Sequence, residues 1–185
     1  MKTISIKNIM SPCDINTLIS YIDNNINNST PSFTSKQESK GGHALAFPDS
    51  LDISESIKTS FIELLEILNK TYKYELNDLS DIEFALVKYV EGCYIPPHID
   101  LLTDDEDPYF DELNKRKLIL ITLLNEPNEF TGGNLSINLD CKHVVPLEMG
   151  QTVCFPSFFP HELSKVESGS RYVLSVVVKG KHPFR

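Results

Sequence analysis

The strongest structural signal in this chain lies in the stretch Phe84-Ala85-Leu86-Val87-Lys88-Tyr89-Val90-Glu91-Gly92-Cys93-Tyr94-Ile95-Pro96-Pro97-His98-Ile99-Asp100. Its first part, 84–90, is mostly apolar and predicts a buried strand. Pro96-Pro97 then forces an extended backbone up to His98. Because side chains two residues apart in an extended strand point to the same side, we expect His98 and Asp100 to project together as two adjacent metal ligands. A His-x-Asp pair alone is weak evidence of a metal site.

The rest of the C-terminal half consists of short apolar runs separated by turns. The run 118–124 is almost free of polar residues, and a turn is expected at Thr131-Gly132-Gly133. After this turn Leu135, Ile137 and Leu139 alternate with polar residues, which is typical of a half-buried strand. Further strand-like runs cover 144–145, 152–155, 163–166 and 171–178. Short strands at this spacing predict a sandwich or barrel, so we expect a jelly-roll-like β-core.

The N-terminal third shows the periodicity of helices instead. Apolar residues recur with helical spacing after Asp14, a candidate N-cap, and the pattern ends in the Asn-rich segment 24–31. A second apolar stripe runs from Ile53 to Leu68, and the segment 32–50 between the helices is expected to be irregular. We therefore expect a mainly β protein with flanking helices (α+β), in which one domain over 1–185 combines helical support (1–80) with a β-core (82–180).

Composition narrows the class of protein. Hydrophobic residues make up 41% of the chain, which excludes a disordered chain. The net charge is −9, which disfavours a nucleic-acid or membrane-surface partner. A cationic substrate or partner fits this charge better. No apolar run is long enough to span a bilayer, and the start of the chain lacks a secretory signal. We expect a cytoplasmic protein whose four scattered cysteines are reduced thiols.

The second half of the sequence strengthens the interpretation of His98 and Asp100 as metal ligands. His161 opens another strand run, in the segment Phe155-Pro156-Ser157-Phe158-Phe159-Pro160-His161. Two histidines and one carboxylate are the ligands of the facial triad in non-haem Fe(II) oxygenases. Arg171 follows on a strand, where alternation predicts that it faces a barrel interior together with Val173. A charge there needs a partner, and a bound dicarboxylate would supply one.

These motifs, in this order and spacing, resemble a known family. Residues 84–178 are similar to the catalytic core of the prolyl-4-hydroxylase-like branch of the 2-oxoglutarate/Fe(II)-dependent dioxygenases. The resemblance is carried by Tyr89, Gly92, Tyr94 and His98-x-Asp100, by Gly132-Gly133-Asn134-Leu135, and by Phe155-Pro156-Ser157 with His161 and Arg171.

The resemblance implies a double-stranded β-helix in which His98, Asp100 and His161 bind Fe(II). It further implies that 2-oxoglutarate chelates the iron and places its far carboxylate on Arg171, with support from the Tyr89 hydroxyl. Tyr94 is assigned with equal weight to lining the substrate or cosubstrate pocket or to packing. O2 is the second cosubstrate, and ascorbate is left open as a reductant.

Two departures from the family pattern concern the far carboxylate of 2-oxoglutarate. Many relatives carry Thr or Tyr where this chain has Ile119 and Leu123, and alternation turns the neighbouring Thr122 the other way. Several branches carry Ser at the position of Val173. How the contacts to this carboxylate are completed is therefore open.

The implied chemistry is hydroxylation of an unactivated C–H bond, with release of succinate and CO2. An intact Asp100 favours hydroxylation over halogenation, because halogenating relatives have a small residue there. The first hypothesis is a prolyl or other residue of a peptide or protein as substrate. The second is a free amino acid or small metabolite, and the third is a non-catalytic, cupin-like metal-binding protein, which Arg171 disfavours. Nothing in the sequence indicates the oligomeric state.

An acidic segment, 103–112, follows the His-x-Asp motif directly. It is interpreted first as a solvated loop and second as a lid over the iron that would favour a cationic substrate. The remaining histidines are assigned no function: His43 to a loop, His143 to the surface or rim, and His182 to the tail.

Overall fold

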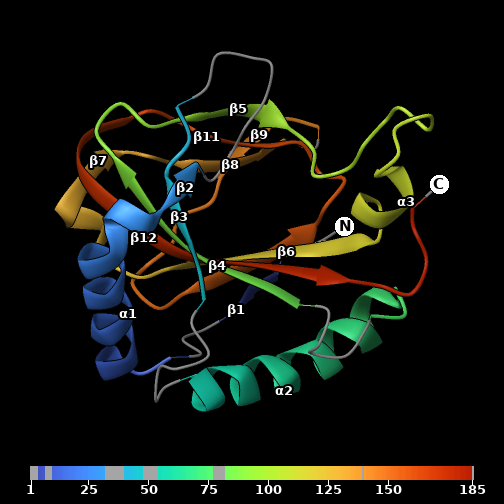
Figure 1. The fold of residues 1–185 in the computed structure, drawn as a ribbon, viewed down its shortest axis with the longest axis horizontal. Coiled ribbons are helices and arrows are strands. Elements are labelled where there is room, and N and C mark those ends of the chain that lie inside the picture. Colours follow the sequence, from blue (N-terminus) through green and yellow to red (C-terminus); the bar gives the residue numbers. More distant parts are fainter. Residues whose placement is uncertain are drawn as a thin grey trace.

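The structure, a computed structural model, describes residues 4–6, 10–31, 40–47, 54–76, 82–138 and 140–184. Ile53 and Leu139, which belong to the predicted patterns, lie outside this range, as does most of the segment 32–50. The described strands form two antiparallel sheets (Figure 1). Apolar side chains from both sheets form a shared core between them, so the sheets pack face to face as in a jelly roll. This confirms the predicted fold class.

The larger sheet has the order β1-β10-β6-β12-β4-β3-β2, and β7 pairs with β12 beside this path. Its strands are β1 (Ile4–Ile6), β10 (Thr152–Pro156), β6 (Arg116–Leu123), β12 (Val166–Lys179), β4 (Ile82–Val90), β3 (His43–Ala46), β2 (Thr30–Pro31) and β7 (Phe130–Gly132). The smaller sheet has the order β5-β11-β8-β9. Its strands are β5 (Ile95–His98), β11 (His161–Leu163), β8 (Leu135–Asn138) and β9 (Lys142–Val144).

Two long helices, α1 (Pro12–Asn25) and α2 (Ser54–Tyr72), cover the side of the larger sheet that faces away from the smaller one (Figure 1). A short helix α3 (Phe110–Leu113) follows the acidic segment, and two single turns, η1 (Ile26–Asn28) and η3 (Pro127–Glu129), complete the fold. No described helix is both long and apolar enough to cross a membrane.

Helix α1 begins one turn earlier than predicted. Ser11 is the N-cap: its hydroxyl accepts a hydrogen bond from the Asp14 N–H at 3.1 Å, and Asp14 accepts from the Ser11 N–H at 3.4 Å. This reciprocal pair is a capping box, and Pro12 stands at the first helical position, where its missing N–H costs nothing. The prediction that Asp14 is the N-cap was therefore wrong, because Asp14 is the third residue of the helix.

The N-terminal third also contributes strands, which the sequence analysis did not predict. β3 pairs with β4, and β2 and β1 extend the two edges of the larger sheet. The prediction of an irregular segment was wrong for 43–46. A strand of this length shows too few alternations to be read from periodicity, and its position is determined by backbone pairing to β4.

Strand β12 divides the interior into two cores. Its residues Leu174, Val176 and Val178 face the helices and pack with both of them. Arg171 and Val173, which alternate with these residues, face the smaller sheet, as the sequence predicts. The helices therefore stabilise the back of the larger sheet and leave its front free to line a site.

Leu68 and Ile67 provide a test of this helix packing. Leu68 of α2 is 0% exposed in the core beneath the helices, whereas its neighbour Ile67 is 60% exposed. Leu68→Ala should lower the free energy of unfolding by about 2–5 kcal/mol because it leaves a cavity, and Ile67→Ala should change it by less than about 0.5 kcal/mol. Chemical denaturation of both variants measures the difference, and equal effects would contradict the packing.

Candidate active site

A cavity of about 710 Å³ lies between the two sheets. Its walls come from β4, β6 and β12 of the larger sheet, from β5, β8 and β11 of the smaller sheet, and from the segment that follows β5. The candidate metal ligands and Arg171 all line this cavity.

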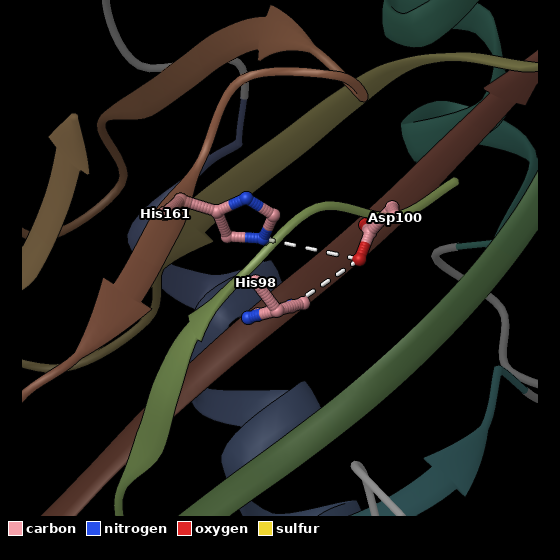
Figure 2. A group of neighbouring side chains, drawn as sticks. All are labelled: His98, Asp100 and His161. Atoms are coloured by element: carbon pink, nitrogen blue, oxygen red, sulfur yellow. Dashed lines mark ion pairs between the residues drawn. The ribbon is translucent and has the colours of Figure 1, made fainter. Parts of the chain in front are cut away.

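His98, Asp100 and His161 converge at one point of the cavity wall (Figure 2). Antiparallel pairing places His161, the first residue of β11, directly opposite His98, the last residue of β5. Asp100 Oδ1 lies 3.3 Å from His98 Nε2 and 3.9 Å from His161 Nε2. The Asp100 N–H donates to the Ser157 carbonyl at 3.0 Å, which fixes the backbone beyond the strand end.

Backbone carbonyls orient both imidazole rings. His98 Nδ1 lies 3.0 Å from the Pro96 carbonyl, and His161 Nδ1 lies 2.9 Å from the Phe159 carbonyl. Because a carbonyl can only accept, each Nδ1 carries a proton, and in the neutral ring each Nε2 keeps its lone pair. Such second contacts are the usual way in which a protein orients histidine ligands.

The electrostatics of the cluster favour a bound cation. Burial acts to raise the pKa of Asp100, but the two histidines and Arg116 outweigh it and hold that pKa below its ordinary value. Burial lowers the pKa of His161. For His98, the adjacent Asp100 outweighs burial, and the pKa is raised. An ionised carboxylate beside oriented imidazole nitrogens, all within 4.8 Å of one another, fits a divalent ion such as Fe(II).

Arg171 is a buried positive charge in the cavity wall. It is 4% exposed, and burial lowers the pKa of its guanidinium to about 10. The ring of Tyr89 lies 5.8 Å from its Cζ, and among the described residues no carboxylate forms an ion pair with it. A buried cation without an anionic partner is costly, so its place in a cavity wall indicates an anionic ligand.

Gly42 supports the position of Tyr89 and was missed by the sequence analysis. A Cβ at Gly42 would lie 2.7 Å from Tyr89 Cδ1 and 2.8 Å from the Lys88 carbonyl oxygen. Only glycine leaves room for the tyrosine ring against this backbone. Gly42 lies in the segment 32–50 that was expected to be irregular, and nothing in the sequence indicates that it contacts Tyr89.

The structure does not bring Tyr94 to the cavity. Leu163 pairs with Ile95 and His161 with His98, so β5 has one more residue than β11 between these pairs. This bulge at Pro96-Pro97 shifts the alternation, and both Ile95 and His98 line the cavity while Tyr94 does not. The backbone of Tyr94 is held on the other side of β5, where its N–H donates to the carbonyl of Lys40 at 2.9 Å.

Arg116 is a second arginine of the cavity wall that the sequence analysis missed. One of its terminal nitrogens lies 3.1 Å from Glu83 Oε2, and its buried Nε has no hydrogen-bond partner among the described residues. The charged run 115–117 carried no signal that distinguished Arg116 from its lysine neighbours. The Nε–H is an unused donor beneath the cavity surface.

The structure shows where the residues that depart from the family pattern lie. Ile119 lines the cavity, whereas Thr122 faces the helices and its hydroxyl lies 2.8 Å from that of Thr152. Val173 lines the cavity as well. Strands β6 and β12 therefore present apolar side chains to the cavity at these positions, and the Tyr89 ring lies 5.8 Å from Arg171 Cζ.

The acidic segment lies in solvent, but its two ends reach the cavity. Residues 103–106 are exposed, whereas Leu101, Leu102 and Leu113 line the cavity. The buried Asn114 side chain closes the segment through two hydrogen bonds to the backbone of Leu102, at 2.8 and 3.0 Å. The exposed, charged tip of the segment fits the predicted solvated loop. The apolar residues that flank the segment form part of the cavity wall.

Replacing Arg171 tests whether its charge lowers the stability of the ligand-free protein. Arg171→Met keeps an unbranched stem against Gly133 and removes the buried, unpaired charge. The free energy of unfolding of the ligand-free protein should rise, by about 1–4 kcal/mol. Thermal denaturation of both proteins in the same buffer measures it, and a lower melting temperature for the variant would contradict the interpretation.

Comparisons with known proteins agree with this site. The model of the 2OG-Fe(II) oxygenase superfamily matches residues 84–179, which include all three candidate ligands and Arg171. A PKHD-type hydroxylase of Acaryochloris marina is 27% identical over 126 residues, covering 67% of this chain and 52% of the relative. Another from Prochlorococcus marinus is 26% identical over 171 residues, covering 90% of this chain and 73% of the relative.

Solved structures share the fold. A Pseudomonas putida prolyl-4-hydroxylase superimposes with a TM-score of 0.77 at 18% identity, covering 97% of this chain and 92% of the other. A Trichoplax adhaerens prolyl hydroxylase, solved with a peptide of a hypoxia inducible factor, gives 0.71 at 13% identity, covering 97% and 84%.

The match to the first of the curated relatives spans about half of that relative's length. The family model, in contrast, covers more than half of this chain and most of the residues that line the cavity. Members of this family use Fe(II), 2-oxoglutarate and O2, and a two-histidine, one-carboxylate cluster is what such an iron requires. The chain belongs to the 2OG-Fe(II) oxygenase superfamily.

Proposed function

We propose that the protein is a hydroxylase that uses Fe(II), 2-oxoglutarate and O2 and acts on a residue of a peptide or protein. The observation that carries the proposal is the buried, unpaired Arg171 in the same cavity as the His98, Asp100 and His161 cluster. A structural metal site requires no such cation. A dicarboxylate cosubstrate accounts for both features at once.

In this proposal His98 Nε2, Asp100 and His161 Nε2 hold the iron and leave the remaining positions open. Bound iron supplies the oxidation, in which 2-oxoglutarate is converted to succinate and CO2 while a substrate C–H bond is hydroxylated. The chain's own contribution is positioning and exclusion of water. The carbonyls of Pro96 and Phe159 hold the imidazole rings in their ligating orientation before any metal binds.

Arg171 binds the far carboxylate of 2-oxoglutarate. Its guanidinium is pre-oriented by burial and by the ring of Tyr89, whose hydroxyl is the proposed second contact. The apolar wall formed by Ile119, Ile121 and Val173 excludes water from the cosubstrate. A carboxylate that reaches this position exchanges hydration for charge-assisted hydrogen bonds in a water-poor environment, where these bonds are strong.

The peptide substrate is supported by two lines of argument. The curated relatives are named PKHD-type hydroxylases, and the similar folds include prolyl hydroxylases, one of them with a bound peptide. In addition, Arg116 places a cationic guanidinium in the cavity wall near Asp100, beside the apolar Leu102 and Leu113. A backbone carbonyl next to an apolar residue would satisfy both features of this wall.

An anaerobic titration tests the cofactor assignment. Fe(II) and 2-oxoglutarate together should give the weak visible charge-transfer band of the chelate in the wild-type protein. His98→Ala should abolish the band, and Arg171→Ala should raise the 2-oxoglutarate concentration needed by roughly 10- to 100-fold, since charged hydrogen bonds are worth about 1.5–3 kcal/mol. Tyr94→Phe is the matched control outside the cavity and should leave the titration unchanged. No band in well-folded wild-type protein would overturn the enzyme assignment.

Arg116 allows the substrate side to be tested separately. Succinate release, measured over a panel of prolyl peptides and free amino acids, first identifies the better class of substrate. Arg116→Gln should then raise the substrate KM about 10- to 100-fold and change the Fe(II)·2-oxoglutarate titration much less, since Arg116 acts on the proposed ligand Asp100 only through its charge. Lys115→Gln, the same change of charge at a residue outside the cavity wall, is the control. An unchanged KM in the Arg116 variant would exclude Arg116 from substrate binding, and release with free amino acids alone would exclude the peptide substrate.

A further inference from the structure

The turn between β8 and β9 carries a second cluster of metal-ligating side chains. Asp140, Cys141 and His143 place a carboxylate oxygen, a thiol sulfur and an imidazole nitrogen within 4.8 Å of one another. Cys141 Sγ lies 3.2 Å from His143 Nε2, and Asp140 Oδ1 lies 3.3 Å from the same nitrogen. All three residues are exposed, so a solvent ion reaches them without any rearrangement of the fold.

The geometry does not fit a nucleophilic triad. In such a triad the carboxylate orients the imidazole through one ring nitrogen while the nucleophile uses the other. Here Cys141 and Asp140 both contact Nε2 of His143. The sulfur, the oxygen and this nitrogen lie within 4.8 Å of one another, as ligands of a common ion do.

The separations of the donor atoms fit a tetrahedral metal. Ligand distances of about 2.3 Å for sulfur and about 2.0–2.2 Å for nitrogen and oxygen imply donor–donor separations of roughly 3.3–3.6 Å. The Cys141 Sγ–His143 Nε2 and Asp140 Oδ1–His143 Nε2 distances, 3.2 and 3.3 Å, lie close to this range. The Cys141 N–H also donates to Asp140 Oδ1 at 2.9 Å, which holds the carboxylate toward the cluster.

Strand pairing and an ion pair to β11 anchor the hairpin that carries the cluster. Asn138 pairs with Lys142 and Ile137 with His143, and Lys142 forms an ion pair with Glu162 of β11. Lys142, the cation nearest to the cluster in sequence, is therefore paired with Glu162. The ligands lie on a backbone that is already held in place, so little conformational entropy is lost when an ion binds.

The cluster is separate from the active site, although it shares a row of the smaller sheet. Across this sheet His98 faces His161, His161 faces Ile137, and Ile137 faces His143. Two strand spacings, about 10 Å, separate His143 from His161 along this row. A metal at the hairpin is thus a distinct site with sulfur among its ligands, whereas the active-site cluster offers only nitrogen and oxygen.

We propose that Asp140, Cys141 and His143 form a second metal site that binds Zn²⁺ or a similar thiophilic divalent ion, with water in the fourth position. Thiolate and imidazole favour such ions over Mg²⁺ or Ca²⁺. The bound ion would tie the tip of the hairpin to the edge strand β9. This inference does not depend on the proposed function, and its test does not use enzyme activity.

Cobalt(II) is the probe, because it occupies zinc sites and a cobalt–thiolate bond absorbs strongly in the near ultraviolet. The active-site cluster has no sulfur and contributes nothing to this band. Cobalt added to the reduced wild-type protein should produce the band with one equivalent per chain and a midpoint in the micromolar range. Cys141→Ser should abolish it and His143→Asn should weaken it at least tenfold, whereas Cys13→Ser, which removes the other exposed thiol, should leave it unchanged.

Alkylation provides a second measurement in the unmodified protein. Zn²⁺ should slow the reaction of Cys141 with iodoacetamide at least tenfold, as followed by mass spectrometry, and should leave Cys13 of the same molecules unaffected. The absence of a thiolate band below about 1 mM cobalt would overturn the site, as would a band that survives in Cys141→Ser. Equal protection of Cys13 and Cys141 would identify adventitious binding to exposed thiols and would overturn it as well.

Discussion

The burial of the Arg171 guanidinium is the constraint on which the rest of the cavity depends. A cation this deep carries a desolvation cost that an anionic ligand would offset, and within the described part of the chain no carboxylate forms an ion pair with it. Gly133 leaves space for its stem, since a Cβ there would lie 3.3 Å from Arg171 Cδ. Tyr89 places its ring alongside the guanidinium, and Gly42 makes room for that ring. The protein accepts lower stability at one position in return for a preformed anion site.

The cluster of candidate metal ligands is built by strand pairing. One antiparallel contact, His161 opposite His98, brings together residues that are far apart in the chain, and the backbone carbonyls beside them set the ring orientation. The ligands are therefore positioned by main-chain geometry that forms as the sheet forms. Such a site needs no rearrangement to accept an ion, which keeps the entropy of binding small.

Much of this arrangement could be predicted from the sequence, because strand alternation and motif spacing are local signals. They indicated the β-core, the two long helices, the three candidate ligands, and the opposite directions of Arg171 and Thr122. What escaped prediction depends on long-range pairing. Strand β3 forms only against β4, the bulge at Pro96-Pro97 removes Tyr94 from the cavity, and Arg116 gains its position from its contact with Glu83. No window of sequence contains both members of these pairs.

Strand β12 runs without interruption past the whole cavity, from the end that holds Arg171 to Lys179, which pairs with Glu83 and Glu112 at the other end. Its side chains alternate between the cavity and the helix-facing core. Inserting or deleting a single residue between Arg171 and Leu174 would turn all residues on one side of the change to the opposite face, so that Arg171 and Leu174 would then share one face of the sheet. Homologous proteins should therefore vary freely in the length of the acidic segment and of the β8–β9 turn, while the number of residues from Arg171 to Val178 stays the same.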